Sequence, residues 1–194
     1  MAVTPSIDDG TDVPAIPTRT IVLLGTSGVA LSAAAIVLLF RWGGLNDLQN
    51  ASDPQEFVDV ALANGREVRW ASWADIVLLV PGYVLFVAAL LACFRRRAGT
   101  PPGVRRASLL GTWAVVAGGV TDEVENAIVQ LGLRSVDFTA VDPVDAGRPA
   151  DGLITALNAA TFSKLLFLFV AGVLLAALFV RAACLRGRRL LGRG

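Results

Sequence analysis

Long apolar runs separated by short polar segments dominate the chain. Four runs reach the length of about 20 apolar residues that a helix needs to cross a bilayer, namely residues 20–40, 75–94, 107–133 and 154–180. The first run has no charged residue, whereas the third and fourth carry ionisable groups that lower their hydropathy. The pattern predicts an all-α polytopic membrane protein, a bundle of four transmembrane helices within residues 20–180.

The segments on either side of this region are polar. Residues 1–19 contain several prolines and three aspartates, which favours a disordered cytoplasmic tail. The first apolar run is preceded by no basic region and is too long for a signal peptide, so we expect it to remain as an anchor. Residues 181–194 are predicted to form a basic cytoplasmic tail.

The segment between the first two runs predicts a short interfacial helix. Asp53 is a suitable N-cap, Pro54 suits the first turn and Glu56 completes a capping box. An apolar stripe begins at Phe57, and Gly65 is a typical helix end. Trp70 and Trp73, which follow, are expected to lie in the aromatic belt at the membrane interface.

Composition and charge agree with a membrane location. The chain is 55% hydrophobic, with a mean hydropathy of +0.64, and its net charge is only +1. Residues 95–106 and the segment after Val180 each contain five arginines and no acid, whereas the loops at 41–74 and 134–153 are rich in acids. The positive-inside rule then places both termini in the cytoplasm of a cell membrane, the inner or plasma membrane.

Some kinds of chemistry are excluded by residue types that the chain lacks. It has no histidine, which excludes a Ser-His-Asp triad, a His-ligated zinc or haem and an imidazole proton shuttle. The loop at 134–153 lacks the ligand spacing of a calcium loop. We therefore expect no metal, no cofactor and no nucleic-acid partner. Membrane lipids and a second copy of the chain are the expected partners, and Cys93 and Cys184 are not expected to pair.

The third apolar run contains a cluster of polar side chains. Asp122, Glu125 and Asn126 follow the i, i+3, i+4 spacing of one helix face, and Glu123 lies on its flank. Charged groups at membrane depth are costly, and they tend to persist where they pair, line a cavity or do chemistry. The cluster is therefore predicted to face the interior of the bundle.

Lys164, the only lysine, lies at a matching height in the fourth run. At 1.5 Å per residue, Asp122 is about 24 Å above Arg106 and Glu125 about 28 Å. Lys164, counted back from Arg181 in the antiparallel helix, is about 25 Å up. Because consecutive helices usually pack together, we expect Lys164 to pair with Asp122 or Glu125.

The second run can approach the same level. It is interrupted by Pro81-Gly82, which permits a kink, and Gly25, Gly28, Ser32 and Ala35 give the first run a face for close packing. Asn158 can add a further polar contact from the fourth run. The candidate ligand- or ion-binding residues, expected to line a pocket open to the outer face, are Asp75, Tyr83, Asp122, Glu123, Glu125, Asn126, Thr161 and Lys164.

The charges in this set are unbalanced. Three acids of the third run face one lysine, so full ionisation would leave two uncompensated negative charges in a low dielectric. We expect at least one carboxylate to be protonated, bound to a cation or reached by water, and the acids to be strongly coupled.

This arrangement resembles a group of bacterial four-helix integral membrane proteins with a D-x-x-E-N motif in the third helix. The motif here is Asp122, Glu125 and Asn126, and Asp75 and Lys164 are similarly placed. The resemblance implies a four-helix fold and lends no activity.

Three interpretations of the cluster therefore stay open. It can serve ion- or proton-linked binding or transport of a small solute. It can be the acid/base centre of an intramembrane enzyme that acts on a lipid or another apolar substrate. It can also be polar glue between helices in a structural bundle. A retinal Schiff base on Lys164 is chemically possible, but four helices scarcely enclose that chromophore.

Overall fold

The computed structural model describes residues 16–42, 44–96, 100–140 and 142–191, with side chains up to residue 185. Every regular element in these ranges is helical. Residues 1–15 of the predicted disordered tail lie outside the described residues, and its last two residues, Thr18 and Arg19, belong to the first helix. The elements are α1 (Thr18–Arg41), α2 (Leu45–Gln49), α3 (Pro54–Asn64), α4 (Glu67–Ala74), the π-helix η1 (Asp75–Leu79), α5 (Val80–Arg95), α6 (Pro102–Arg134) and α7 (Asp151–Leu191).

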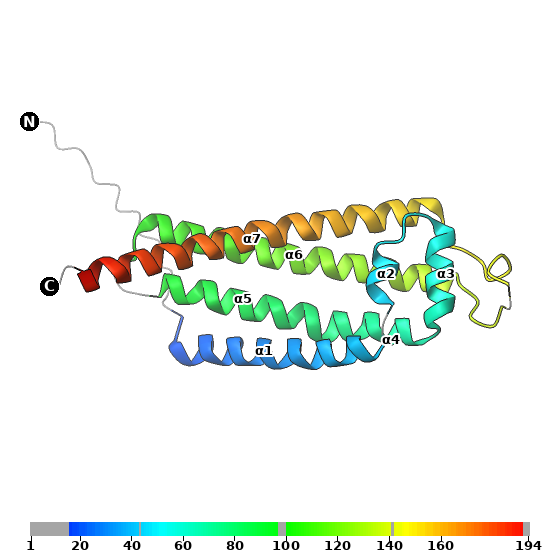
Figure 1. Ribbon diagram of the computed structural model, residues 1–194, viewed down its shortest axis with the longest axis horizontal. Helices are drawn as coiled ribbons and strands as arrows, with labels where there is room; N and C mark the ends of the chain where they lie inside the picture. The colour runs from blue at the N-terminus through cyan, green and yellow to red at the C-terminus, as the bar shows by residue number, and fades with distance from the viewer. Residues whose placement is uncertain (1–15, 43, 97–99, 141, 192–194) are drawn as a thin grey trace, which may run out of the picture.

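The long helices pack in the order in which they occur along the chain. α1 packs against α5 and η1, α5 packs against α6, and α6 packs against α7, so that α1 and α7 lie at opposite edges (Figure 1). The start of α1 and the end of α7 are at one end of the molecule. α2, α3 and the 135–150 loop are at the other end (Figure 1).

Three helices are long and apolar enough to cross a membrane: Thr18–Arg41, the continuous helix Glu67–Arg95, and Asp151–Leu185 of α7. Most of their apolar surface is not covered by other parts of the protein. These features indicate a helical membrane protein. α6 is also long enough, but the acids and glycines along it lower its hydropathy, as the sequence predicted.

Several helix ends differ from the sequence predictions. The second helix begins at Glu67, two turns before Asp75, so Trp70 and Trp73 lie within its first two turns. α6 begins at Pro102, because proline suits the first helical turn, and it therefore includes part of the predicted arginine loop. α7 continues beyond Val180 to Leu191, so most of the predicted basic tail is helical. Residue 180 marks the end of the apolar run, and the helix itself continues past it.

The predicted face of small residues on α1 is confirmed, because it packs closely against α5. A Cβ at Gly28 would lie 2.6 Å from the Phe86 backbone nitrogen, and a Cβ at Gly82 would lie 2.6 Å from Ser32 Oγ. Gly82 thus permits the two backbones to approach. Pro81 does not interrupt the helix, because the π turn of η1 precedes it and α5 continues to Arg95.

The predicted short helix is present as α3, with its predicted N-cap. Asp53 Oδ1 accepts a hydrogen bond from the Glu56 backbone nitrogen at 2.9 Å, and Gly65 ends the helix with φ +58°. Glu56 reaches back to the Ser52 nitrogen at 2.7 Å, one residue earlier than a standard capping box requires. Hydrogen bonds from Ser52 lower the pKa of Glu56 below its ordinary value.

The apolar face of α3 is buried in protein. Phe57, Val58 and Ala61 are fully buried in a cluster that also contains Leu133 of α6 and Leu157 of α7. α3 therefore lies across the end of the bundle and closes it (Figure 1). Its apolar stripe is covered by α6 and α7 and is not a lipid-facing surface.

Candidate functional site

Lys164 of α7 contacts two carboxylates of α6. Its Nζ lies 2.6 Å from Glu125 Oε2 and 3.2 Å from Asp122 Oδ1. The Glu125 side chain is 0% exposed and that of Lys164 only 14%. The predicted contact between Lys164 and the acids of the third run is therefore present, with both Asp122 and Glu125 as partners.

Asp122 also receives a hydrogen bond from the second helix. The Tyr83 hydroxyl donates to Asp122 Oδ2 at 2.9 Å, whereas Lys164 occupies Oδ1. Both oxygens of Asp122 thus have a donor, one from α5 and one from α7. These contacts connect three helices through one carboxylate.

Asn126 joins Asp75 to the same cluster. Its Nδ2 donates to Asp75 Oδ2 at 2.7 Å and to the Asp122 backbone carbonyl at 3.1 Å. Both Asn126 and Asp75 are buried. The predicted approach of Asp75 is confirmed, and it occurs where the π turn of η1 begins.

Two further members of the cluster were not predicted. Gln49 of α2 donates through Nε2 to Asn126 Oδ1 at 3.5 Å, and the Ser72 hydroxyl of α4 donates to the same oxygen at 3.3 Å. Ser72 is fully buried and Gln49 is nearly so. The sequence signal for Ser72 was its position three residues before Asp75, which places both on one helix face. No local signal indicates that α2 folds back onto Asn126.

Glu125 is a fully buried carboxylate that lacks a hydrogen-bond donor. Its Oε1 is buried and accepts no hydrogen bond of good geometry, although the Thr161 hydroxyl lies near enough to interact with this side chain. That hydroxyl is directed to the carbonyl oxygens of Leu157, at 3.1 Å, and Gln49, at 3.4 Å. A buried acceptor without a donor is costly, so this oxygen is a natural place for a proton or a small ligand.

Two residues of the predicted set lie apart from this network. Glu123 is half-buried and makes no hydrogen bond or ion pair with any residue that the structure describes. Asn158 is exposed on α7 and does not join the cluster. Both predictions rested on the height of the residue along its helix. Membership of the network also depends on the direction in which the side chain points.

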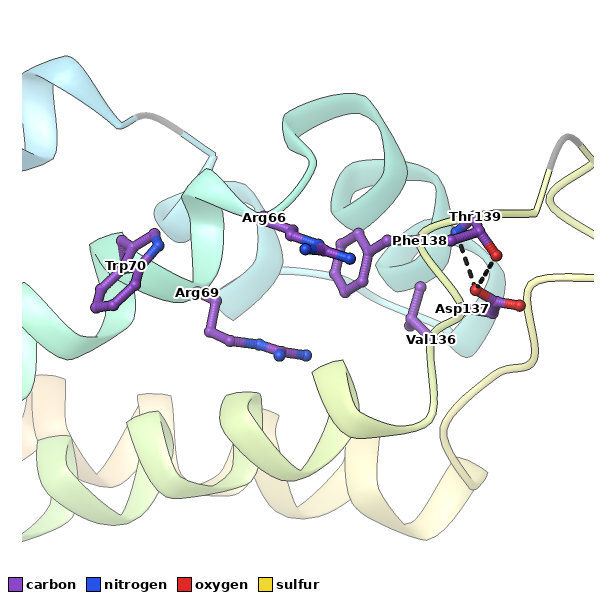
Figure 2. A pocket seen from close by; sticks show the side chains of 7 residues that line it. All are labelled: Arg66, Arg69, Trp70, Val136, Asp137, Phe138 and Thr139. Atoms are coloured by element: carbon purple, nitrogen blue, oxygen red, sulfur yellow. Dashed lines mark hydrogen bonds between the residues drawn. The ribbon is translucent and has the colours of Figure 1, made fainter.

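A pocket of about 550 Å³ among the described residues lies at the end of the bundle that carries α3. Arg66, Arg69 and Trp70 line one side, and residues 136–139 of the loop after α6 line the other (Figure 2). None of the eight predicted site residues lines this pocket.

The described residues contain no group of three or more His, Cys, Asp or Glu side chains that is arranged to hold a metal ion. Cys93 and Cys184 are exposed and unpaired. Comparisons with protein-family models, with curated proteins and with solved structures find no match for this chain. The function is therefore inferred from the geometry of the cluster.

Proposed function

We propose that the protein has four transmembrane helices, with α6 as the third, and that the buried cluster binds and exchanges protons in support of solute binding or transport. The side chains of α6 are distributed as a spanning helix requires. Its exposed positions include Leu110, Trp113 and Val120, whereas Asp122 and Glu125 are buried against neighbouring helices. A lipid-facing apolar surface with charges turned inward is typical of a transmembrane helix.

The proposed orientation has the start of α1 and the end of α7 in the cytoplasm of a cell membrane. The two ends lie on one side of the molecule, where α5 also ends and α6 begins (Figure 1). Arg95 and Arg96 lie at the end of α5, and Arg105 and Arg106 lie near the start of α6. The opposite end carries α3 and the acidic 135–150 loop. This distribution agrees with the excess of basic residues that cytoplasmic loops carry.

The observation that carries the proposal is the imbalance of charge in a closed network. Asp75, Asp122 and Glu125 face one cation, Lys164, and Tyr83 is the remaining titratable member. Full ionisation would leave two uncompensated negative charges away from water. Low dielectric disfavours that state, so binding of a proton is the simplest way to reduce the surplus charge.

Glu125 is the proposed proton-binding group. Both oxygens of Asp122 receive donors, from Tyr83 and Lys164. Glu125 Oε1 has no such donor, so a proton there removes a charge without breaking a hydrogen bond of Asp122. Lys164 contacts both carboxylates and can turn toward either as their protonation changes.

Proton uptake into proteoliposomes tests this proposal. The purified protein is reconstituted with a pH-sensitive dye inside, and a potassium diffusion potential drives proton entry. We expect uptake above that of protein-free liposomes, and we expect Glu125→Gln to reduce it at least about tenfold. Glu123→Gln is the matched control, because it changes the neighbouring acid outside the network and should retain most of the uptake.

A second candidate, polar glue between helices, is favoured by the contacts through which Asp122 and Asn126 connect α6 to α5, α7 and η1. In that case the cluster stabilises the helix contacts and has no exchangeable proton. Wild-type protein would then give no uptake above the liposome background, and Glu125→Gln would lower only the free energy of unfolding. Such a result would reject the proton-linked function and retain the structural one.

A further inference from the structure

The outer pocket brings two arginines together beside aromatic side chains. Arg66 directly precedes α4, and Arg69 lies in its first turn. Both side chains extend toward Phe138 of the loop after α6 (Figure 2). Trp70 lines the same pocket and is 61% exposed. A pocket of about 550 Å³ with this lining is large enough for a small anionic group.

Arg69 is held in place within this pocket. Its Nη2 donates to the Leu133 carbonyl oxygen at the end of α6, at 3.1 Å, and its guanidinium carbon lies 5.6 Å from the centre of the Phe138 ring. Guanidinium has five N–H donors, so other donors of Arg69 stay available to a ligand. The exposed Arg66 side chain makes no hydrogen bond or ion pair with a described residue.

The one acid that lines the pocket, Asp137, is bound to its neighbour Thr139. Asp137 Oδ1 accepts hydrogen bonds from the Thr139 backbone nitrogen at 2.9 Å and from its hydroxyl at 2.7 Å. Asp137 lies on the loop side of the pocket, away from Trp70 (Figure 2). The side bounded by α4 therefore presents positive charge, with aromatic surface next to it.

The height of the pocket agrees with the headgroup region of a bilayer. Arg69 precedes Arg95 by 26 residues of continuous helix, which corresponds to about 39 Å. A bilayer is about 40–45 Å thick including its headgroups. If Arg95 lies at one membrane surface, Arg69 lies among the phosphates of the other leaflet, where Trp70 is also a typical residue.

We propose that Arg66 and Arg69 form a binding site for a phosphate group, supplied by the headgroup of a phospholipid in the outer leaflet. Arginine donates in a planar fork that matches phosphate oxygens, which is why it is common at such sites. The lipid chains would follow the exposed apolar surface below Trp70. The site is separate from the buried cluster and does not depend on proton exchange there.

Calorimetric titration of the full chain in an uncharged detergent tests this site. The titrants are dihexanoyl phosphatidylglycerol, dihexanoylglycerol with the same chains and no phosphate, and inorganic phosphate at constant ionic strength. We expect the phosphatidylglycerol to bind, and each of Arg66→Gln and Arg69→Gln to weaken its Kd about tenfold, since charge-assisted hydrogen bonds are lost. Arg134→Gln removes an exposed arginine outside the pocket at the same end of the molecule and should change Kd less than twofold.

The titrants also distinguish the source of the phosphate. Arginine-dependent binding of phosphatidylglycerol with little binding of inorganic phosphate supports a headgroup site. Equal arginine-dependent binding of inorganic phosphate overturns the lipid assignment in favour of a soluble anion. The whole proposal is overturned if dihexanoylglycerol binds equally well, if neither phosphate compound binds, or if Arg134→Gln weakens binding as much as the pocket variants. Arg66 packs against little protein, so its variant remains informative if Arg69→Gln fails to fold.

Discussion

Lys164 and Glu125 meet at 2.6 Å between Nζ and Oε2, across the contact between α7 and α6, and the Glu125 side chain is completely buried. The two residues are 39 positions apart in the chain, and the 135–150 loop separates their helices. Their contact therefore depends on the packing of α6 against α7, and it should contribute to the stability of that packing.

Removal of either partner should destabilise the protein. Lys164→Met leaves a buried carboxylate without its cation, and Glu125→Gln removes the charge opposite the lysine, so we expect losses of up to about 3–5 kcal/mol. The double variant should lose less than the sum, with a coupling energy of about 0.5–3 kcal/mol, when unfolding is followed in mixed micelles. Glu123→Gln combined with Lys164→Met should be additive. If the losses of Glu125→Gln and Lys164→Met were also additive, the contact between the two residues would contribute no pairwise energy.

Asn126 should be indispensable to the position of Asp75. Asn126→Leu removes the donor at 2.7 Å from Asp75 Oδ2 and leaves that buried oxygen without it, which costs about 1–3 kcal/mol or more for a charged group. Asp75→Leu in the same chain should recover part of the loss, because no unpaired acceptor remains. Thermal unfolding measures the stability of the single and the double variant. The control is Asn158→Leu on the exposed surface of α7, which should change stability by less than about 0.5 kcal/mol. Equal losses for Asn126→Leu and Asn158→Leu would contradict this role.

The close approach of α1 and α5 should not tolerate a methyl group. Gly82→Ala places a Cβ 2.6 Å from Ser32 Oγ and 2.7 Å from Ser32 N, so the helices must separate, at a cost of about 1–3 kcal/mol. Gly172→Ala on α7 meets nothing within 4 Å and should be neutral or slightly stabilising. Thermal unfolding in detergent compares the two variants. A neutral Gly82→Ala would show that the helices are not in close contact in the membrane.

Acid should loosen α3 before the rest of the protein. The folded-state pKa of Glu56 is below its ordinary value because Ser52 donates to its carboxylate, so its stabilisation is present above that ordinary value and is lost as pH falls through the folded-state pKa. Hydrogen exchange of α3 amides should therefore accelerate toward low pH, relative to the intrinsic rate. Glu56→Gln should remove most of this dependence, and Glu67→Gln on α4 should retain it. The same acceleration in both variants would assign the effect to another group.

Labelling can test the proposed topology. In a chain with Cys93 and Cys184 replaced by serine, Thr100→Cys should react with an impermeant maleimide only after the cells are opened, because the 95–106 segment is proposed to be cytoplasmic. Thr139→Cys, in the loop at the opposite end, should react in intact cells. Reaction of residue 100 from outside would reverse the assignment.

The contact between Lys164 and the α6 acids could be predicted because helix geometry is regular. Counting the rise per residue from Arg106 and Arg181 placed the charges at one level, and the low dielectric of the membrane supplied the reason for them to meet. The same count placed Asn158 near the cluster, but it points outward. The rise per residue predicts the height of a side chain along its helix. The rotation of the helix about its axis depends on tertiary packing, which the sequence pattern does not predict.

The approach of α2 and its Gln49 to Asn126 could not be predicted for a related reason. Gln49 and Ser72 reach it from the segment between α1 and α5, whose path over the end of the bundle is determined by tertiary contacts such as those of Phe57. The N-cap of α3 was predictable because Asp53 and Glu56 act locally. The position of the whole helix is not a local property.

The π turn at Asp75–Leu79 has a consequence for the direction of the residues on either side of it. Asp75 and Gly82 are seven positions apart, so in an uninterrupted α-helix they would differ by only about 20° and both would face α1. A π turn accommodates about one additional residue, which corresponds to a rotation of about 100°. Gly82 can therefore contact α1 while Asp75 turns to Asn126 on α6. Deletion of a single residue within η1 would remove this additional rotation and direct the Asp75 carboxylate away from Asn126. The composition of the helix would scarcely change.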